Sequence, residues 1–191
     1  MRIILASESP RRMELLKLMG LDFVVVPSNI DEYLPKDVST EDLVMALAQQ
    51  KARAVAAQYP QDCVIGADTV VELDGTVFGK PHIPEKAKAY LHRLQGREHV
   101  VYTGVAVQKG EYEGLRCCAT KVLFAPMSEK EIDWYVATCE PLDKAGAYGV
   151  QGLGSIFVES VKGNYFNVIG MPIPLLYRML KDAGVLHVKC V

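Results

Sequence analysis

The stretch IILASESPRRMELLKLMG, residues 3–20, joins a short apolar run to a helical pattern through a turn rich in hydroxyl groups. The apolar run over residues 3–6 is typical of a buried strand. Ser9 then offers a helix N-cap, Pro10 suits the first helical position, and Gly20 is a typical helix stop. A strand followed directly by a helix indicates an α/β fold.

Beyond this stretch, strand and helix signals alternate along the chain without an internal repeat or a low-complexity tract. Apolar and β-branched runs predict strands over residues 23–26, 63–71, 76–78, 100–107, 115–124 and 156–159. Capping-box signals beginning at Ser39 and Ser128, together with helical spacing, predict helices over residues 40–58, 84–94, 129–136 and 174–183. The pair Asp74-Gly75 is a strong hairpin signal. Long paired strands combined with crossover helices predict an elongated mixed sheet with flanking helices.

The composition is that of a globular protein, because half of the 191 residues are apolar and 23% are charged. This length fits one domain or two small lobes. With 21 Lys and Arg against 23 Asp and Glu, the net charge of −2 argues against a broad surface for a nucleic-acid backbone. No apolar run approaches the roughly 20 residues of a membrane span. Neither nucleic acid nor a membrane is therefore an expected partner.

The chain has five cysteines, at positions 63, 117, 118, 139 and 190, and no Cys-x-x-Cys pair. An odd number without metal-ligand spacing predicts reduced thiols in a cytoplasmic protein, with neither a disulfide framework nor a zinc site. Cys139 lies just before a glycine-rich segment and could act as a catalytic thiol. A small buried side chain is the favoured interpretation, because free cysteines are usually buried.

The turn between the first strand and the first helix carries Ser7, Ser9, Arg11 and Arg12. Helix N-termini favour acidic residues because the helix dipole is positive there, so two arginines in the first turn are unfavourable by themselves. A bound phosphate would offset that cost, since backbone N–H groups, hydroxyls and a guanidinium could all converge on it. Two solvated arginines beside an ordinary Ser9 cap are the simpler alternative. The phosphate interpretation is favoured, although the segment is not a Walker loop.

Lys51 and Asp68 are charged residues at positions where apolar ones are expected. Lys51 lies on the apolar stripe of the predicted helix 40–58, four residues after Leu47. Its ammonium either extends along that stripe to solvent or meets a phosphate or carboxylate. Asp68 interrupts the apolar strand 63–71, where a carboxylate is costly unless it is paired, hydrogen-bonded or metal-bound. Capping of a bend at the strand end is the alternative for Asp68.

Three further features add to this inventory. Glu32 is an acidic residue in a turn, and Lys80 follows the predicted hairpin in Gly79-Lys80-Pro81. The segment 140–154 contains four glycines within nine residues, together with Asp143, Lys144, Tyr148 and Gln151. Its glycines would let the backbone approach a ligand and Gln151 could read a base edge, whereas an ordinary flexible loop is the alternative. Cations, carboxylates and glycine-rich backbone together are typical of metal-assisted phosphoryl chemistry on a nucleotide or phosphoester.

Motifs in matching order and spacing resemble the Maf family over nearly the whole chain. They include Ser7-x-Ser9-Pro10-Arg11-Arg12, Gly66-Ala67-Asp68-Thr69-Val70-Val71, Gly79-Lys80-Pro81, Glu140-Pro141-Leu142-Asp143-Lys144-Ala145-Gly146-Ala147-Tyr148-Gly149-Val150-Gln151-Gly152 and Asn167-Val168-Ile169-Gly170-Met171-Pro172. The resemblance implies a single domain over residues 1–191, with two lobes around a central cleft and the fold of the inosine-triphosphate pyrophosphatases. It also implies hydrolysis of nucleoside triphosphates to monophosphate and diphosphate, which prevents incorporation of non-standard nucleotides.

The resemblance further implies roles for individual residues. Asp68 would activate the attacking water, and Arg11, Thr69 and Gln151 would select the base. Phosphate would be bound by Ser7, Ser9, Arg11, Arg12, Lys51 and Lys80. Glu32 and Asp68 would bind a divalent cation, Mg²⁺ or Mn²⁺, in a protein that forms a homodimer. The segment 143–152 matches the branch acting on dTTP and UTP rather than the one acting on 7-methyl-GTP, and canonical or modified pyrimidine nucleotides both fit.

Two other functions are compatible with these residues. A nucleotidyltransferase also begins with a strand, a basic loop and a helix, but it releases diphosphate only when an acceptor is present. A nucleotide-binding regulator of cell division, suggested by the link between Maf-like proteins and septum formation, would bind nucleotide without turnover. The presence of Asp68, Lys51 and Lys80 favours catalysis over such a regulator.

Overall fold

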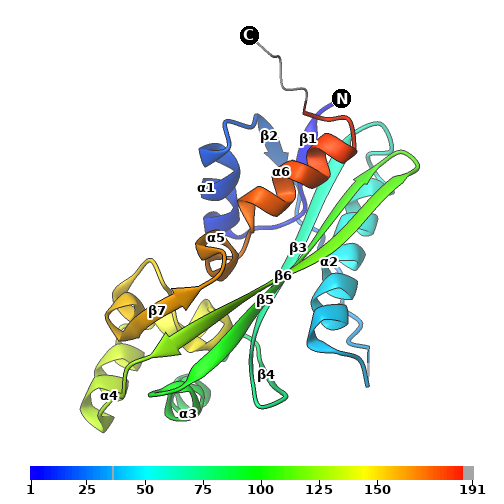
Figure 1. Ribbon diagram of the computed structural model, residues 1–191. Coiled ribbons are helices and arrows are strands. Elements are labelled where there is room, and N and C mark those ends of the chain that lie inside the picture. The colour runs from blue at the N-terminus through cyan, green and yellow to red at the C-terminus, as the bar shows by residue number, and fades with distance from the viewer. Residues whose placement is uncertain (36, 187–191) are drawn as a thin grey trace. The chain divides into compact units, whose positions relative to one another are not determined.

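The computed structural model describes residues 1–35 and 37–186, so Cys190 lies outside the described residues (Figure 1). The strands are β1 (Ile3–Leu5), β2 (Phe23–Val25), β3 (Cys63–Leu73), β4 (Thr76–Phe78), β5 (Glu98–Lys109), β6 (Tyr112–Phe124) and β7 (Val158–Lys162). The α-helices are α1 (Pro10–Leu18), α2 (Thr40–Ala56), α3 (Pro84–Leu94), α4 (Glu129–Ala137), α5 (Tyr165–Ile169) and α6 (Ile173–Asp182). Three 3-10 helices follow α4 as η1 (Glu140–Asp143), η2 (Ala145–Ala147) and η3 (Leu153–Phe157). None of the described helices is long and apolar enough to cross a membrane.

The described strands form one mixed sheet in the order β2-β1-β3-β5-β6-β7, with β4 paired to β3. β1 runs parallel to both β2 and β3, so that Ile4 has Val24 on one side and Val64 on the other. β4 and β7 run antiparallel to β3 and β6, respectively. Asp74 and Gly75 both have positive φ, as a tight hairpin turn between β3 and β4 requires. The predicted mixed α/β sheet with flanking helices is confirmed.

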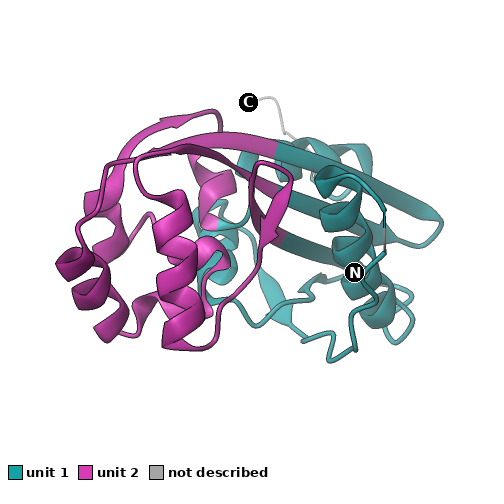
Figure 2. Ribbon diagram, turned by 90° about the horizontal axis from the view of Figure 1, so that it is seen from below, with its two compact units in different colours: residues 1–68, 103–118, 170–191 teal, residues 69–102, 119–169 magenta. Residues whose placement is uncertain are grey.

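The chain divides into two compact units, coloured separately in Figure 2. Unit 1 comprises residues 1–68, 103–118 and the chain from 170 on, whereas unit 2 comprises residues 69–102 and 119–169. β3, β5 and β6 each contribute residues to both units. Each unit has an apolar cluster of its own, built around Ile4, Val55 and Val64 in unit 1 and around Leu91, Phe124 and Tyr135 in unit 2.

In unit 1, α2 lies against β3 and β5 at two glycines. A Cβ atom on Gly66 would come within 2.3 Å of the Ala48 carbonyl oxygen, and one on Gly104 within 2.2 Å of the Val44 carbonyl oxygen. Both distances are far below van der Waals contact, so glycine is required where the strands meet the helix backbone. Ser39 caps α2 as predicted, because its hydroxyl accepts the Asp42 N–H at 3.1 Å.

In unit 2, α3 and α4 pack together beside a core that is rich in aromatic side chains. α4 begins with the predicted capping box, in which the Ser128 hydroxyl accepts the Glu131 N–H and the Glu131 carboxylate accepts the Ser128 N–H. Tyr148 is buried, with its ring 4.5 Å from that of Phe124.

Several local predictions differ from the structure. The strand predicted over 156–159 begins only at Val158, because residues 153–157 form η3. The short helix α5 was not expected, and the glycine-rich segment contains 3-10 turns rather than irregular loop. Cys139 is exposed and has a φ of 61°, so the prediction of a buried side chain is wrong.

We expect the substitution Gly104→Ala to destabilise the protein, because the new methyl group forces α2 away from β5. Overpacking of this kind typically costs 1–3 kcal/mol, and for a chain of this size about 2 kcal/mol lowers the melting temperature by roughly 4–8 °C. Gly79→Ala is the matched control, since a Cβ atom there meets nothing within 4 Å and the backbone conformation suits alanine. Equal melting temperatures for the two variants would show that stability does not depend on the close approach of α2 to β5 at Gly104.

Candidate active site

Lys51 on α2 brings together two carboxylates that the sequence analysis singled out. Its ammonium lies 2.5 Å from Asp68 Oδ1 and 2.9 Å from Glu32 Oε1. The Lys51 and Asp68 side chains are only 13% and 14% exposed, whereas that of Glu32 is 40% exposed. Lys51 therefore does not simply extend to solvent along the apolar stripe; it forms a charged cluster in unit 1.

The position of Asp68 follows from the strand that carries it. Residues 63–67 of β3 are buried, and Asp68 is the first partly buried residue after them. Removing one member of a poorly solvated ion pair leaves the other charge uncompensated, which is strongly destabilising. Asp68 and Glu32 also interact electrostatically with the Arg12 guanidinium, so the two carboxylates face two cations rather than one.

Arg12 is held by protein acceptors on three sides. Its Nη1 donates to the Ala67 carbonyl at 2.9 Å and to the Ser7 hydroxyl at 3.2 Å, and its Nε donates to the Gly170 carbonyl at 2.9 Å. Burial lowers the pKa of the Arg12 guanidinium, and the nearby Arg11 lowers it further, against the opposing effect of Asp68.

Arg12 thus ties three segments of unit 1 to one another: the turn after β1, the residue before Asp68 and the segment before α6. Ser9 caps α1 as predicted, with its hydroxyl accepting the Arg12 backbone N–H at 3.5 Å, and Ser7 accepts the Ser9 N–H at 3.2 Å. The sequence analysis missed this supporting role of Arg12. Its signal was the same unfavourable arginine at a helix N-terminus that suggested phosphate binding.

Arg11 lies in the first turn of α1 in unit 1, and the remaining predicted site residues belong to unit 2. Thr69 follows Asp68 directly in β3, while Lys80 and Gln151 are exposed side chains on connecting segments. The segment around Lys80 is joined to the glycine-rich segment by two hydrogen bonds. Gly146 donates its N–H to the Gly79 carbonyl at 3.2 Å, and His82 donates to the Leu142 carbonyl at 3.0 Å.

Two polar residues of the glycine-rich segment have structural roles in unit 2. The Tyr148 hydroxyl makes a 2.9 Å hydrogen bond with His99 Nε2 inside the core. Burial lowers the pKa of His99 to about 4, so this imidazole is neutral at neutral pH. Glu140 received no role from the sequence, yet its carboxylate accepts hydrogen bonds from the backbone of Leu153 and Gly154. Glu140 lies six residues before the first of the four glycines, and no pattern in the sequence signals its role.

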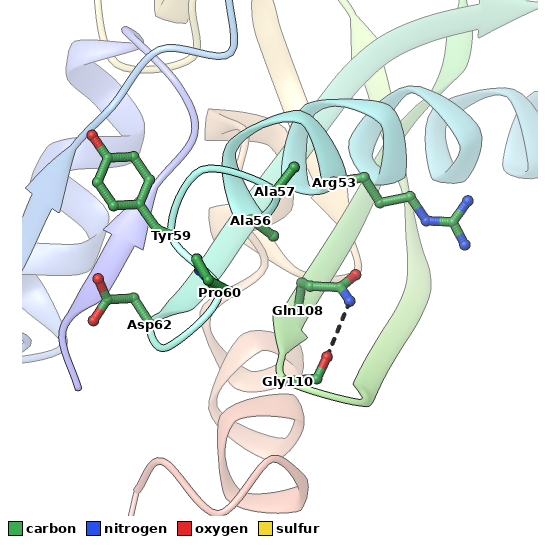
Figure 3. Close-up of a pocket in the computed structure, with 8 residues that line it drawn as sticks. All are labelled: Arg53, Ala56, Ala57, Tyr59, Pro60, Asp62, Gln108 and Gly110. Carbon is green, nitrogen blue, oxygen red and sulfur yellow. Dashed lines mark hydrogen bonds between the residues drawn. The ribbon is translucent and has the colours of Figure 1, made fainter.

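Unit 1 also contains a pocket of about 280 Å³ that none of the predicted site residues lines (Figure 3). In this pocket, the Gln108 side chain donates a 3.5 Å hydrogen bond to the Gly110 carbonyl. Its lining consists of Arg53, Ala56, Ala57, Tyr59, Pro60, Asp62, Gln108 and Gly110. Within residues 1–35 and 37–186, no group of three or more His, Cys, Asp or Glu side chains forms a metal site.

Comparison with known proteins gives concordant results. The family described as Maf-like protein matches residues 2–183. A dTTP/UTP pyrophosphatase of Symbiobacterium thermophilum is 48% identical over 96% of this chain and 94% of its own length. A dTTP/UTP pyrophosphatase of Bacillus velezensis is 45% identical over 96% of this chain and 97% of its own length. The solved structure of the Staphylococcus aureus Ham1 protein matches with a TM-score of 0.55 and 19% identity, covering 96% of this chain and 100% of that chain, which shows a shared fold.

We expect Arg12→Lys to lower the free energy of unfolding by about 2 kcal/mol, because the single nitrogen of lysine cannot take the positions of both Nε and Nη1 and leaves a poorly solvated carbonyl unpaired. Chemical denaturation measures the change. Arg53→Lys is the control, since Arg53 makes a bidentate but exposed pair with Glu113 and should lose less than about 1 kcal/mol. A loss at Arg12 no larger than at Arg53 would contradict the supporting role.

Proposed function

This chain belongs to the Maf family, and from that premise we propose that it hydrolyses dTTP and UTP to nucleoside monophosphate and diphosphate. Relatives that carry the name dTTP/UTP pyrophosphatase match it over nearly their whole length. The observation that carries the proposal is the cluster in which Lys51 pairs with both Asp68 and Glu32. The homodimer and the cytoplasmic location stay predictions from the sequence.

The charged cluster suits an attack of water on the α-phosphorus. A carboxylate of Asp68 within reach of that water would accept its proton as the new P–O bond forms. The bond between the α-phosphorus and the bridging oxygen then breaks, and diphosphate leaves. Lys51 holds the Asp68 side chain in place, since its ammonium donates a 2.5 Å hydrogen bond to Asp68 Oδ1. Arg11 would neutralise charge that develops on the phosphate oxygens.

For three residues of unit 2, we propose the roles that the family resemblance implies. Thr69 and Gln151 would select the base, and Lys80 would bind phosphate. Lys80 and Gln151 support this by being exposed, and therefore accessible to a ligand. Ser7, Ser9 and Arg12 already make hydrogen bonds within the protein. We therefore propose that they contribute more by shaping the turn between β1 and α1 than by binding phosphate directly.

The carboxylates of Glu32 and Asp68 fit a divalent cation. Mg²⁺ prefers oxygen ligands and is commonly bound by one or two carboxylates together with the phosphates of a substrate. Two carboxylates are what this cluster offers, so substrate phosphates would supply the other ligands. Glu32 and Asp68 would hold the ion, with Lys51 between them as the neutralising charge. When bound, the cation would supply Lewis acidity to the phosphate oxygens.

We expect Asp68→Asn to lower kcat for UTP by about 10²–10⁴-fold, because the amide cannot accept the proton from water. Release of diphosphate, followed by a coupled assay, measures the loss, and a thermal melt checks that the variant remains folded. Asp74→Asn is the control, since Asp74 lies on the exposed β3–β4 turn and asparagine also suits its positive φ. Near-normal turnover by the Asp68→Asn variant would show that Asp68 does not accept the proton from the attacking water.

We expect dTTP and UTP to be hydrolysed faster than GTP or 7-methyl-GTP in the presence of Mg²⁺ or Mn²⁺. Diphosphate should appear without any acceptor molecule, and chelation of the metal should stop its release until the metal is restored. A preference for 7-methyl-GTP would overturn the substrate assignment. Release that requires an acceptor would indicate a nucleotidyltransferase, and tight binding without release would indicate a regulator.

A further inference from the structure

The glycine-rich backbone of unit 2 folds around the side chain of Glu140. Its Oε2 accepts the Leu153 N–H at 2.8 Å, and its Oε1 accepts the Gly154 N–H at 3.1 Å. Oε1 also accepts the hydroxyl of Tyr135 at 2.8 Å. One carboxylate therefore fixes the backbone on the C-terminal side of Gln151.

Tyr135 extends this arrangement to the N-terminal side of Gln151. Its hydroxyl oxygen accepts the Gly149 N–H at 3.1 Å while its O–H donates to Glu140. Tyr135 is fully buried, and burial raises the pKa of its phenol, so the hydroxyl remains protonated. The backbone is thus held on both sides of Gln151 by one hydrogen-bonded pair, Tyr135 and Glu140.

Two glycines of this segment, Gly152 and Gly154, are required by the same pair. A Cβ atom on Gly152 would come within 2.4 Å of Glu140 Oε2, and one on Gly154 within 2.4 Å of the Tyr135 hydroxyl. A Cβ atom on Gly149 would lie 3.3 Å from Glu140 Oε1 and closer still to the Lys144 side chain. These three glycines, interpreted from the sequence as a means of approaching a ligand, let the chain approach its own side chains.

The Glu140 carboxylate is ionised in this setting. Burial opposes its ionisation, but the N–H groups of Leu153 and Gly154 and the Tyr135 hydroxyl stabilise the anion and lower its pKa, with Lys144 acting in the same direction. The Lys144 ammonium also donates to the Glu140 carbonyl at 2.7 Å. Hydrogen bonds to a charged acceptor are stronger than neutral ones, so the segment is held firmly.

We propose that Glu140 is a positioning residue for nucleotide selection: it holds the backbone on either side of Gln151 and so sets how precisely that side chain meets a base. This inference rests on the proposed function, in which Gln151 selects the base. Because base recognition contributes to binding the substrate and the transition state alike, Glu140 acts on KM and on discrimination among nucleotides, with little effect on kcat.

The test compares Glu140→Gln with the wild type. The carboxamide places an N–H group against backbone N–H groups and removes the charge. We expect KM for UTP to rise about tenfold with kcat changed less than about threefold, and the preference for UTP over CTP and GTP to fall by about tenfold. Amide hydrogen exchange at Leu153 and Gly154 should become faster. Tyr135→Phe preserves the apolar packing and should give a smaller change in the same direction.

A double-mutant cycle separates positioning from general stability. If Glu140 acts through Gln151, then Gln151→Ala alone should lose the discrimination, and adding Glu140→Gln should lose little more. Glu131→Gln is the matched control, because Glu131 is exposed and its carboxylate accepts its hydrogen bonds from Ser128, at the start of α4. Its kinetic constants should equal those of the wild type.

Several results would overturn the inference. One is an unchanged nucleotide preference in Glu140→Gln. Another is a fall in kcat that is equal for all nucleotides while KM stays constant. A third is that the losses of nucleotide discrimination caused by the Glu140 and Gln151 substitutions are additive. If the Glu140→Gln variant is poorly folded, the nucleotide preference of the Tyr135→Phe variant tests the inference instead. A wild-type protein that releases no diphosphate would instead overturn the proposed function, before any variant is compared, and this inference with it.

Discussion

Helix α2 lies so close to β3 and β5 that both strands carry glycine where any side chain would meet the helix backbone. The contact at Gly66 lies two residues before Asp68 on the strand, and Ala48 lies three residues before Lys51 on the helix. The same close approach therefore places the Lys51 ammonium beside the Asp68 carboxylate. A helix pushed outward by one methyl group would separate two poorly solvated charges as well as disturb the core.

Each unit contains one charged side chain that binds the backbone of its own unit at two points. In unit 1, the Arg12 guanidinium binds two backbone carbonyls, one of them beside Asp68. In unit 2, the Glu140 carboxylate binds two backbone N–H groups near Gln151. In each case a buried or half-buried ion fixes the backbone next to an exposed or partly exposed side chain of the proposed site. Such pre-organisation reduces the conformational entropy that the protein would lose on binding a ligand.

Much of the fold could be predicted because local signals agree with it. Ser9, Ser39 and Ser128 cap the helices that they were expected to cap, and Asp74-Gly75 turns the hairpin. The convergence of Lys51 and Asp68 was suggested by charges at apolar positions, but their pairing depends on packing between distant segments. The role of Glu140 could not be predicted, because hydrogen bonds from a side chain to backbone leave no periodic pattern. Glycines that accommodate a ligand and glycines that accommodate a carboxylate look identical in a sequence.

The hydrogen bonds around Glu140 bear on how such a protein could be re-engineered. The segment 149–154 looks like a removable module, yet its shape is set by a tyrosine on α4 and a glutamate on η1. Transplanting the segment alone into another scaffold would transfer its amino-acid sequence without its conformation. A graft that keeps the geometry has to carry residues 135–154 as one piece, including the left-handed Cys139 that turns the chain between the two anchors.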